Sequence, residues 1–259
     1  MTAKPLSEIT AEALRLSASA SEQGICIRIL GGVAVGLHAS EGIHPALIRE
    51  YRDIDLVAPR KTDREVLRLL LDAGYESNKR FNDMVGVHGR LVVYDTANGR
   101  QLDVFVGEFS MCHALPLADR LLADSPTVPL AELLLTKLQI VKLNEKDVRD
   151  IAAIVLDHDV AEHDHEAVNA AHVAQLLSGD WGLWRTCQGS LSAARATIPT
   201  LGLEPERAAL VDDRLGRLWE RVEKQPKSLK WKARARVGER TRWYEEPDEI
   251  GHRELNGST

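Results

Sequence analysis

The sequence has few cysteines and no long hydrophobic run, and both absences narrow the class of protein. Cys26, Cys112 and Cys187 are odd in number and widely spaced, so they form neither a disulfide framework nor a CxxC metal site. Free thiols at this low density suit a reducing cytosol. No run of 18 apolar residues is present, and residues 1–16 lack the apolar core of a signal peptide. These absences predict a cytoplasmic protein with no membrane partner.

Two common nucleotide-binding glycine motifs are also missing. The chain contains no GxxxxGK[ST] loop, and GGVAVG at residues 31–36 lacks the GxGxxG order. We find no internal repeat and no low-complexity tract. What remains is a chain of 259 residues with 44% hydrophobic and 28% charged residues, which is typical of one large or two small globular domains.

The charge of the chain is unevenly distributed. A formal net charge of −6 argues against a dedicated nucleic-acid-binding protein if the charge is uniform. Residues 224–242, which we call the basic segment, carry eight lysines and arginines and one acid, so the segment is +7 and the rest is −13. Trp231 lies inside the segment and Trp243 follows it. Basic and aromatic residues together suit RNA, and a solvated charged segment is the alternative.

Hydrophobic periodicity predicts a mixed first part and a helical second part. Short strands are expected at residues 25–30, 53–57, 91–94 and 102–106, and helices at 6–23, 33–39 and 62–73. Asn98-Gly99 predicts a hairpin between the last two strands, and Thr62 is expected to cap the helix at 62–73. From Pro129 onward helices are expected at residues 130–143, 147–156, 167–178, 182–198 and 204–222.

We therefore predict an α+β fold. A small mixed sheet with flanking helices occupies residues 1–125, and a helical domain with the basic segment occupies 126–242. A loose tail is expected at 243–259.

Three aspartates give the strongest chemical signal. Asp53 and Asp55 are two residues apart on an expected strand, which puts both side chains on one face, about 7 Å apart along the chain. Asp103 lies on another expected strand and points away from its apolar row. Carboxylates that converge from adjacent strands can hold two Mg²⁺ ions. The alternative for an isolated Asp-x-Asp pair is a solvated sheet edge.

Gly31 and Gly32 lie between an expected strand and an expected helix. Two glycines allow a phosphate to approach the backbone closely, and the helix N-terminus offers free N–H groups and a positive dipole. The alternative is a simple tight turn.

These elements together resemble the nucleotidyltransferase superfamily with the DNA-polymerase-β-like fold. The residues that carry the resemblance are Gly31-Gly32, Arg52-Asp53-Ile54-Asp55-Leu56 and Asp103. Residues 133–151 (LLLTKLQIVKLNEKDVRDI) are similar to a segment of the bacterial branch that includes abortive-infection type toxins and antibiotic nucleotidyltransferases. The resemblance covers residues 25–155, with a longer spacing between Gly32 and Asp53 than is usual.

The resemblance implies a site and a reaction. The implied catalytic residues and ligands of two Mg²⁺ ions are Asp53, Asp55 and Asp103. The implied contacts to a nucleoside triphosphate, ATP included, are Gly31, Gly32, Arg52 and Lys137. For Lys137 a solvent-facing helix lysine is the alternative, and for Arg52 an ordinary residue at a strand entry.

The expected reaction transfers a nucleoside monophosphate from the triphosphate to an acceptor hydroxyl and releases pyrophosphate. The acceptor is RNA, such as a tRNA end, or a small molecule of the aminoglycoside or lincosamide type. A non-catalytic nucleotide-binding member of the fold is a further alternative. The toxin-like branch also implies an antitoxin protein as a partner.

Overall fold

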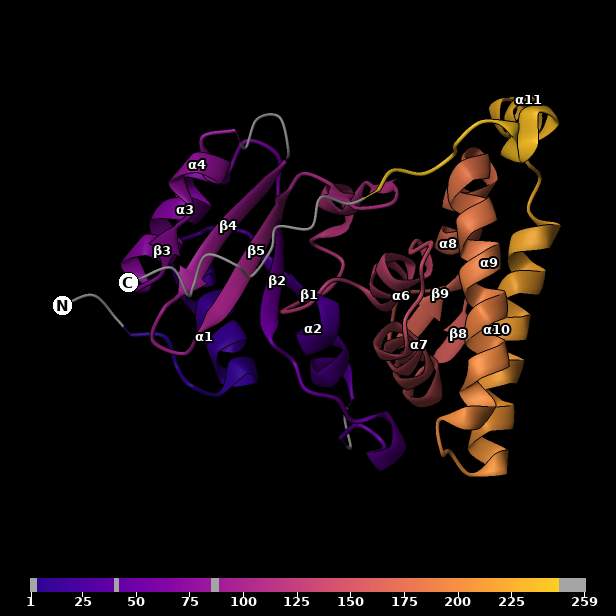
Figure 1. Cartoon of the computed structure of the whole chain (residues 1–259), viewed down its shortest axis with the longest axis horizontal. Helices are drawn as coiled ribbons and strands as arrows, with labels where there is room; N and C mark the ends of the chain where they lie inside the picture. The colour runs from indigo at the N-terminus through magenta and orange to yellow at the C-terminus, as the bar shows by residue number, and fades with distance from the viewer. Residues whose placement is uncertain (1–3, 40–41, 85–88, 247–259) are drawn as a thin grey trace, which may run out of the picture.

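The computed structural model describes residues 4–39, 42–84 and 89–246, and the chain forms a sheet half and a helical half (Figure 1). The fold is α+β, as predicted. The main sheet has the strand order β1-β2-β5-β4-β3. Its strands are β1 (Arg28–Leu30), β2 (Asp53–Ala58), β3 (Glu76–Ser77), β4 (Arg90–Asp95) and β5 (Arg100–Val106). Within this sheet β2 and β5 are parallel and the other neighbouring strands are antiparallel.

Helices of the sheet half bury the apolar residues of the sheet. They are α1 (Ile9–Glu22), α2 (Gly31–His38), α3 (Asp63–Asp72) and α4 (Lys79–Asn82). In α3, Val66, Leu69 and Leu70 are buried, while the charged positions between them face solvent. The hairpin between β4 and β5 is confirmed, and Gly99 has a positive φ of 67° in its turn. Thr62 occupies the N-cap position of α3 as predicted, but its side chain makes no capping hydrogen bond, because the hydroxyl donates to the carbonyl of Pro59 instead.

The helical half follows and contacts the sheet half through α2. Its helices are α6 (Leu130–Leu138), α7 (Glu145–Asp157), α8 (Ala170–Gly179), α9 (Trp181–Thr197), α10 (Pro205–Lys224) and α11 (Leu229–Val237). Helix α2 packs against both α6 and α7. The chain entering α6 is fixed to β1, since the N–H of Ile29 donates to Pro126 and the N–H of Val128 donates to Ile29.

The structure differs from the sequence expectations in several further places. The helix expected at 130–143 ends at Leu138, and α7 begins after a capping box at Asn144. Residues 109–115 form the hairpin of β6 (Phe109–Ser110) and β7 (Ala114–Leu115). The parallel pair β8 (Asp159–Ala161) and β9 (Ala167–Asn169) was not predicted, and the helix expected at 167–178 begins at Ala170 instead. The basic segment contains α11, which was not predicted.

The expected loose tail at 243–259 is docked where the structure describes it. The indole of Trp243 donates to Thr186, and the N–H of Glu245 donates to the carbonyl of Cys112. Residues 247–259 lie outside the described residues.

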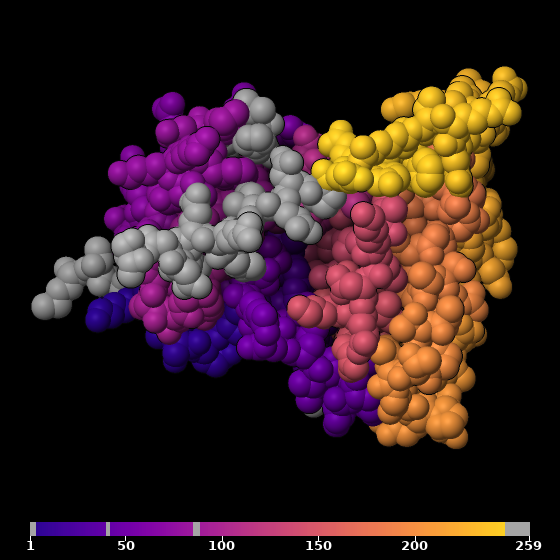
Figure 2. All heavy atoms as spheres, in the orientation of Figure 1, coloured from indigo at the N-terminus to yellow at the C-terminus, as the bar shows by residue number. Residues whose placement is uncertain are grey.

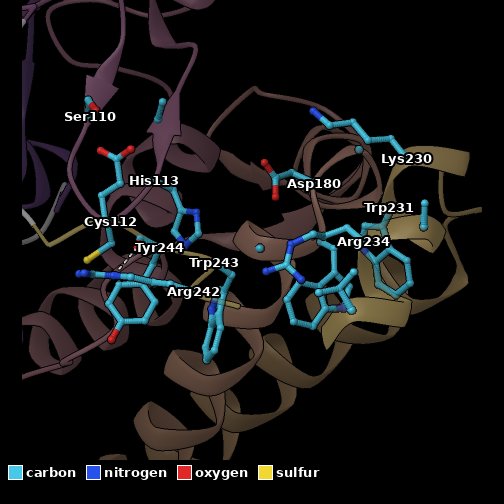
Figure 3. A pocket seen from close by; sticks show the side chains of 17 residues that line it. Ser110, Cys112, His113, Asp180, Lys230, Trp231, Arg234, Arg242, Trp243 and Tyr244 are labelled. Carbon is cyan, nitrogen blue, oxygen red and sulfur yellow. Dashed lines mark hydrogen bonds between the residues drawn. The ribbon is translucent and has the colours of Figure 1, made fainter. Parts of the chain in front are cut away.

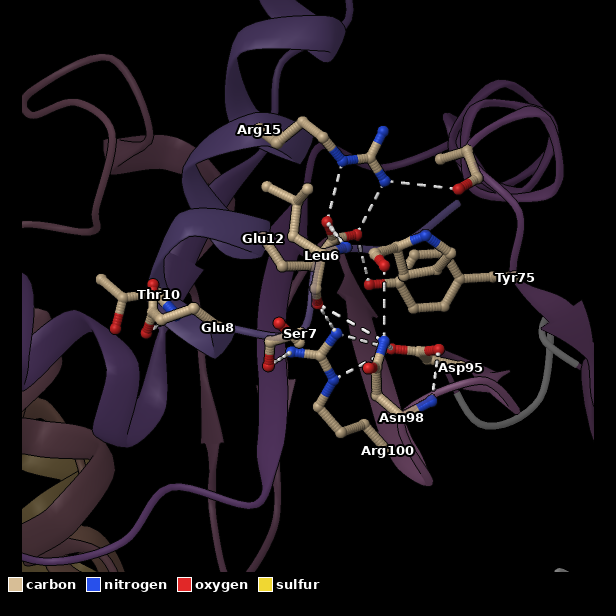
Figure 4. A network of polar contacts seen from close by, with 12 residues as sticks. Leu6, Ser7, Glu8, Thr10, Glu12, Arg15, Tyr75, Asp95, Asn98 and Arg100 are labelled. Carbon is tan, nitrogen blue, oxygen red and sulfur yellow. Dashed lines mark hydrogen bonds and ion pairs between the residues drawn. The ribbon is translucent and has the colours of Figure 1, made fainter. Parts of the chain in front are cut away.

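A buried polar network fixes the N-terminal segment at the edge of the sheet half (Figure 4). The carboxylate of Glu12 is fully buried and accepts hydrogen bonds from Arg15, from the hydroxyl of Tyr75 and from the N–H of Leu6. Arg100 joins Asp95 to the carbonyl of Leu6. Every charge in this network has a partner within it, so we interpret it as structural. No helix in the described ranges is long and apolar enough to cross a membrane.

Candidate functional site

The parallel pairing of β2 and β5 brings the three predicted aspartates together. Asp55 lies opposite Asp103 in the register, and Asp53 lies opposite Gln101. Asp53 is exposed, Asp55 is half-buried and Asp103 is buried. They open into a hollow of about 210 Å³, which we call the Asp cleft. Its lining residues are Leu30, Gly31, Asp53, Asp55, Arg90, Asp103, Phe105, Phe109, Met111, Thr136, Lys137, Gln139 and Ile140.

Negative charge is crowded at the floor of the Asp cleft. Burial, together with the charges of Asp53 and Asp103, raises the pKa of Asp55 to about 8. Within the described part of the chain neither Asp53 nor Asp55 forms an ion pair. Lys137 and Arg90 offset only part of this negative charge, because the pKa of Asp55 stays raised, and a bound cation stabilises such an arrangement.

Asp103, in contrast, is held by two neighbours that the sequence analysis missed. Arg90 on β4 contacts its Oδ1 at 2.9 Å, and the side-chain amide of Gln101 donates to its Oδ2 at 2.9 Å. Across residues 4–39, 42–84 and 89–246, no three His, Cys, Asp or Glu side chains are arranged to hold a metal ion. The signal for Arg90 in the sequence is one basic residue at the start of the apolar run Leu91–Val93.

The donor set nevertheless fits Mg²⁺ bound together with a phosphate ligand. Mg²⁺ prefers oxygen donors, and proteins usually hold it with one or two carboxylates plus substrate phosphates and water rather than with a complete protein cage. Asp53 and Asp55 supply those two carboxylates.

Gly31 is required by the geometry of the Asp cleft. Helix α2 begins at this residue, directly after β1, and its φ is +70°. A Cβ at Gly31 would lie 2.2 Å from the Oδ2 of Asp55, and one at Gly32 would lie 2.2 Å from a guanidinium nitrogen of Arg49. Both glycines therefore allow neighbouring side chains of the protein to approach the backbone at the start of α2 closely.

Lys137 reaches the Asp cleft from α6 and is fixed by carboxylates behind it. Its Nζ lies 2.8 Å from Asp150, and both guanidinium contacts from Arg49 to Asp150 are 2.7 Å. Burial alone would lower the pKa of Lys137, but Asp150 and Asp147 outweigh it and raise that pKa. Lys137 is therefore a fixed positive charge in the lining of the cleft, and Arg49 is a residue that the sequence analysis missed.

Arg52 does not join this group. It is exposed, pairs with exposed Glu50 at 3.1 Å, and is not among the residues that line the Asp cleft. The structure thus brings six of the seven predicted site residues to one place, five of them in the lining and Gly32 beside it.

The basic segment forms a ridge on the helical half (Figure 2). Helix α11 begins after Ser228, whose hydroxyl caps Trp231, and it has no buried residue. In the described ranges no carboxylate pairs with six of the cations of the basic segment. These are Lys227, Lys230, Lys232, Arg234, Arg236 and Arg240.

Comparisons with known proteins give limited information. No family model matches the chain, and no curated protein matches it. One solved structure with similarity is described as an antigenic nucleotidyltransferase-like protein from Paracoccidioides brasiliensis, with 14% sequence identity and a TM-score of 0.43. The match covers 87% of this chain and 96% of that chain.

Proposed function

We propose that the chain is a Mg²⁺-dependent nucleotidyltransferase that uses a nucleoside triphosphate and an acceptor hydroxyl. The observation that carries the proposal is the side-by-side register of Asp55 and Asp103 on parallel strands, with Asp53 beside them and, in the described part of the chain, no ion pair to Asp53 or Asp55. The resemblance of the sequence motifs to the superfamily agrees with it.

The chain's own residues have distinct parts in this reaction. Asp53 and Asp55 would hold the Mg²⁺ ions, with Asp103 as the third carboxylate; the bound metal would neutralise phosphate charge and favour ionisation of the attacking hydroxyl. The acceptor oxygen forms a bond to the α-phosphorus, the bond from that phosphorus to the bridging oxygen breaks, and pyrophosphate leaves. Asp103 accepts the hydroxyl proton, and Arg90 keeps its carboxylate oriented.

Lys137 stabilises the triphosphate as a fixed point charge. Because Asp150 and Arg49 hold it in one position, little reorganisation accompanies the build-up of charge on the leaving group. Gly31 and the first N–H groups of α2 form the wall on which phosphates rest.

We propose RNA as the acceptor, and six cations without a carboxylate partner in the described basic segment support it. The antitoxin partner and the cytoplasmic location stay predictions.

Labelled nucleotides test this proposal. The protein is incubated with each α-³²P-labelled triphosphate and Mg²⁺, in parallel with total RNA and with an aminoglycoside and lincosamide panel. We expect label in RNA from the wild type and from Asp72→Asn, a remote exposed control, and none from Asp53→Asn. Label in an antibiotic instead would show that the acceptor is a small molecule and not RNA. No label with any triphosphate or acceptor would contradict the proposed nucleotidyltransferase activity.

A further inference from the structure

A second hollow lies beside the Asp cleft and is larger. It has a volume of about 810 Å³, within the range of sites that bind small ligands. Helix α11 and residues 242–245 line one side of it, and α11 packs against α9 (Figure 3). We call it the tryptophan cavity, and its lining includes Cys112, His113, Trp181, Arg234, Trp243 and Tyr244.

Aromatic rings and cations alternate in the lining of the tryptophan cavity. The guanidinium of Arg234 lies 4.6 Å from the ring centre of Trp181, and that of Arg242 lies 5.0 Å from the ring centre of Tyr244. Lys230 also lines the hollow and, in the described ranges, pairs with no carboxylate. Two acids, Asp180 and Glu245, face it as well, and Asp180 is engaged as the N-cap of α9.

One lining group lacks a hydrogen-bond partner. The indole Nε1 of Trp231 is buried and, among the described residues, nothing accepts its hydrogen bond. A buried indole N–H usually finds an acceptor, so this donor is left unsatisfied by the described residues around the hollow.

The residues that form the walls of the tryptophan cavity are closely packed. The hydroxyl of Thr186 contacts both His113, at 2.8 Å, and the indole of Trp243, at 3.1 Å. A Cβ at Gly182 would lie 2.8 Å from the carbonyl of Trp243, so glycine is needed for the last segment to dock there. The tail residues are therefore a built wall of the hollow.

One hairpin separates the two hollows. Side chains alternate along it, so Phe109 and Met111 line the Asp cleft while Ser110 and Cys112 line the tryptophan cavity. A hydrogen bond of 2.7 Å from the N–H of His113 to Gln139, which lines the Asp cleft, crosses the same wall.

We propose that the tryptophan cavity binds the terminal nucleotides of a single-stranded nucleic acid. Bases stack on its aromatic rings, phosphates contact Arg234 and Lys230, and the terminal hydroxyl passes the β6–β7 hairpin into the Asp cleft. The inference rests on the proposed function for the last step only. Stacking plus cationic contacts is the chemistry that holds single strands without sequence readout, and the unpaired cations of the described part of α11 continue the path outward.

Binding is tested without Mg²⁺ and without a triphosphate, so that it does not depend on catalysis. Fluorescence anisotropy is measured with an end-labelled oligoribonucleotide, the matching oligodeoxyribonucleotide, a blunt duplex and a poly-glutamate peptide as competitor. We expect both single strands to bind more tightly than the duplex, with affinity that falls as salt rises.

The variants test the cavity itself. Trp243→Ala is expected to weaken binding about tenfold, the loss of roughly one stacked base, and Trp243→Phe to restore most of it. Lys230→Glu is expected to weaken binding to a similar degree, and Arg68→Glu, a charge reversal on the remote helix α3, to leave it unchanged. Circular dichroism checks that each variant is folded.

The outcomes separate this inference from the proposed function. Unchanged binding in Trp243→Ala and Lys230→Glu overturns the cavity as the site, and competition by poly-glutamate equal to that of RNA points to an acidic protein instead. Cavity-dependent binding with no label transfer from any triphosphate removes the proposed enzyme and leaves the site. Transfer to a small cationic acceptor without oligonucleotide binding removes the nucleic-acid site and leaves the proposed enzyme.

Discussion

The Asp cleft and the tryptophan cavity lie on two sides of one short hairpin and differ in almost every physical respect. The Asp cleft is small, closely packed at the junction of β1 and α2, and crowded with carboxylates. The tryptophan cavity is about four times larger, lined by rings and cations, and formed by the end of the described chain. The difference suggests that one hollow carries out chemistry and the other supplies affinity.

Substitution of Asp53 should produce the largest change in activity and test most directly whether the two hollows have separate roles. Asp53→Asn removes one carboxylate of the proposed metal site, so transfer should fall by about 10³-fold, in line with the loss of one preorganised catalytic group. Asp53 is exposed, so the melting temperature should hold. Oligonucleotide affinity should stay within about twofold, whereas Trp243→Ala should raise the KM for RNA and retain kcat. If both variants change the same parameter, the two hollows do not have separate roles.

Asp150→Asn should give the largest loss of stability. The change leaves Lys137 and Arg49 without their shared carboxylate in a mostly buried position, which costs about 3 kcal/mol in the free energy of unfolding. Urea unfolding measures it, with Asp72→Asn as the exposed control. A loss no greater than that of the control would show that Lys137 is not fixed by this pair.

The spacing of residues allowed prediction of the Asp cleft but not of the tryptophan cavity. The two-residue period of strands puts Asp53 and Asp55 on one face, and the Asn98-Gly99 turn gave the pairing of β4 with β5. That Asp103 joins the pair was implied by the resemblance, because the pairing of β2 with β5 does not follow from spacing. Arg90 could not be found in this way, because its contact depends on the register across that hairpin.

The tryptophan cavity joins segments that are far apart in the sequence, from residue 110 to residue 245, and no local pattern encodes such contacts. Helix α11 was missed for a related reason. It buries no residue, so it has no apolar stripe to reveal its period.

Gly31→Ala tests whether the Asp cleft depends on close packing at the start of α2. An alanine there adopts a positive φ and also meets Asp55. Gly24→Ala is the matched control, because Gly24 has a φ of +69° and a methyl group added there would meet nothing within 4 Å among the described residues. Each should lose about 1 kcal/mol from the backbone, and Gly31→Ala should lose about 1 kcal/mol more, with transfer reduced. Equal losses in urea unfolding would mean that Asp55 moves aside freely.

The last expected effect is a pH dependence of stability that originates in Asp55. Because burial and the neighbouring carboxylates raise its pKa to about 8 in the folded chain, the folded state keeps a proton that the unfolded state releases near pH 4. Without Mg²⁺ this contribution is complete below about pH 4 and is lost as the pH rises to about 8. Asp55→Asn should therefore raise the melting temperature at pH 8 and have little effect at pH 4. Mg²⁺ should stabilise the wild type more at pH 8 than at pH 5. It should stabilise the Asp55→Asn variant much less than the wild type at either pH. If Asp55→Asn has the same pH profile of stability as the wild type, the titrating group lies elsewhere. The control Lys230→Glu, in the tryptophan cavity, should leave the profile unchanged.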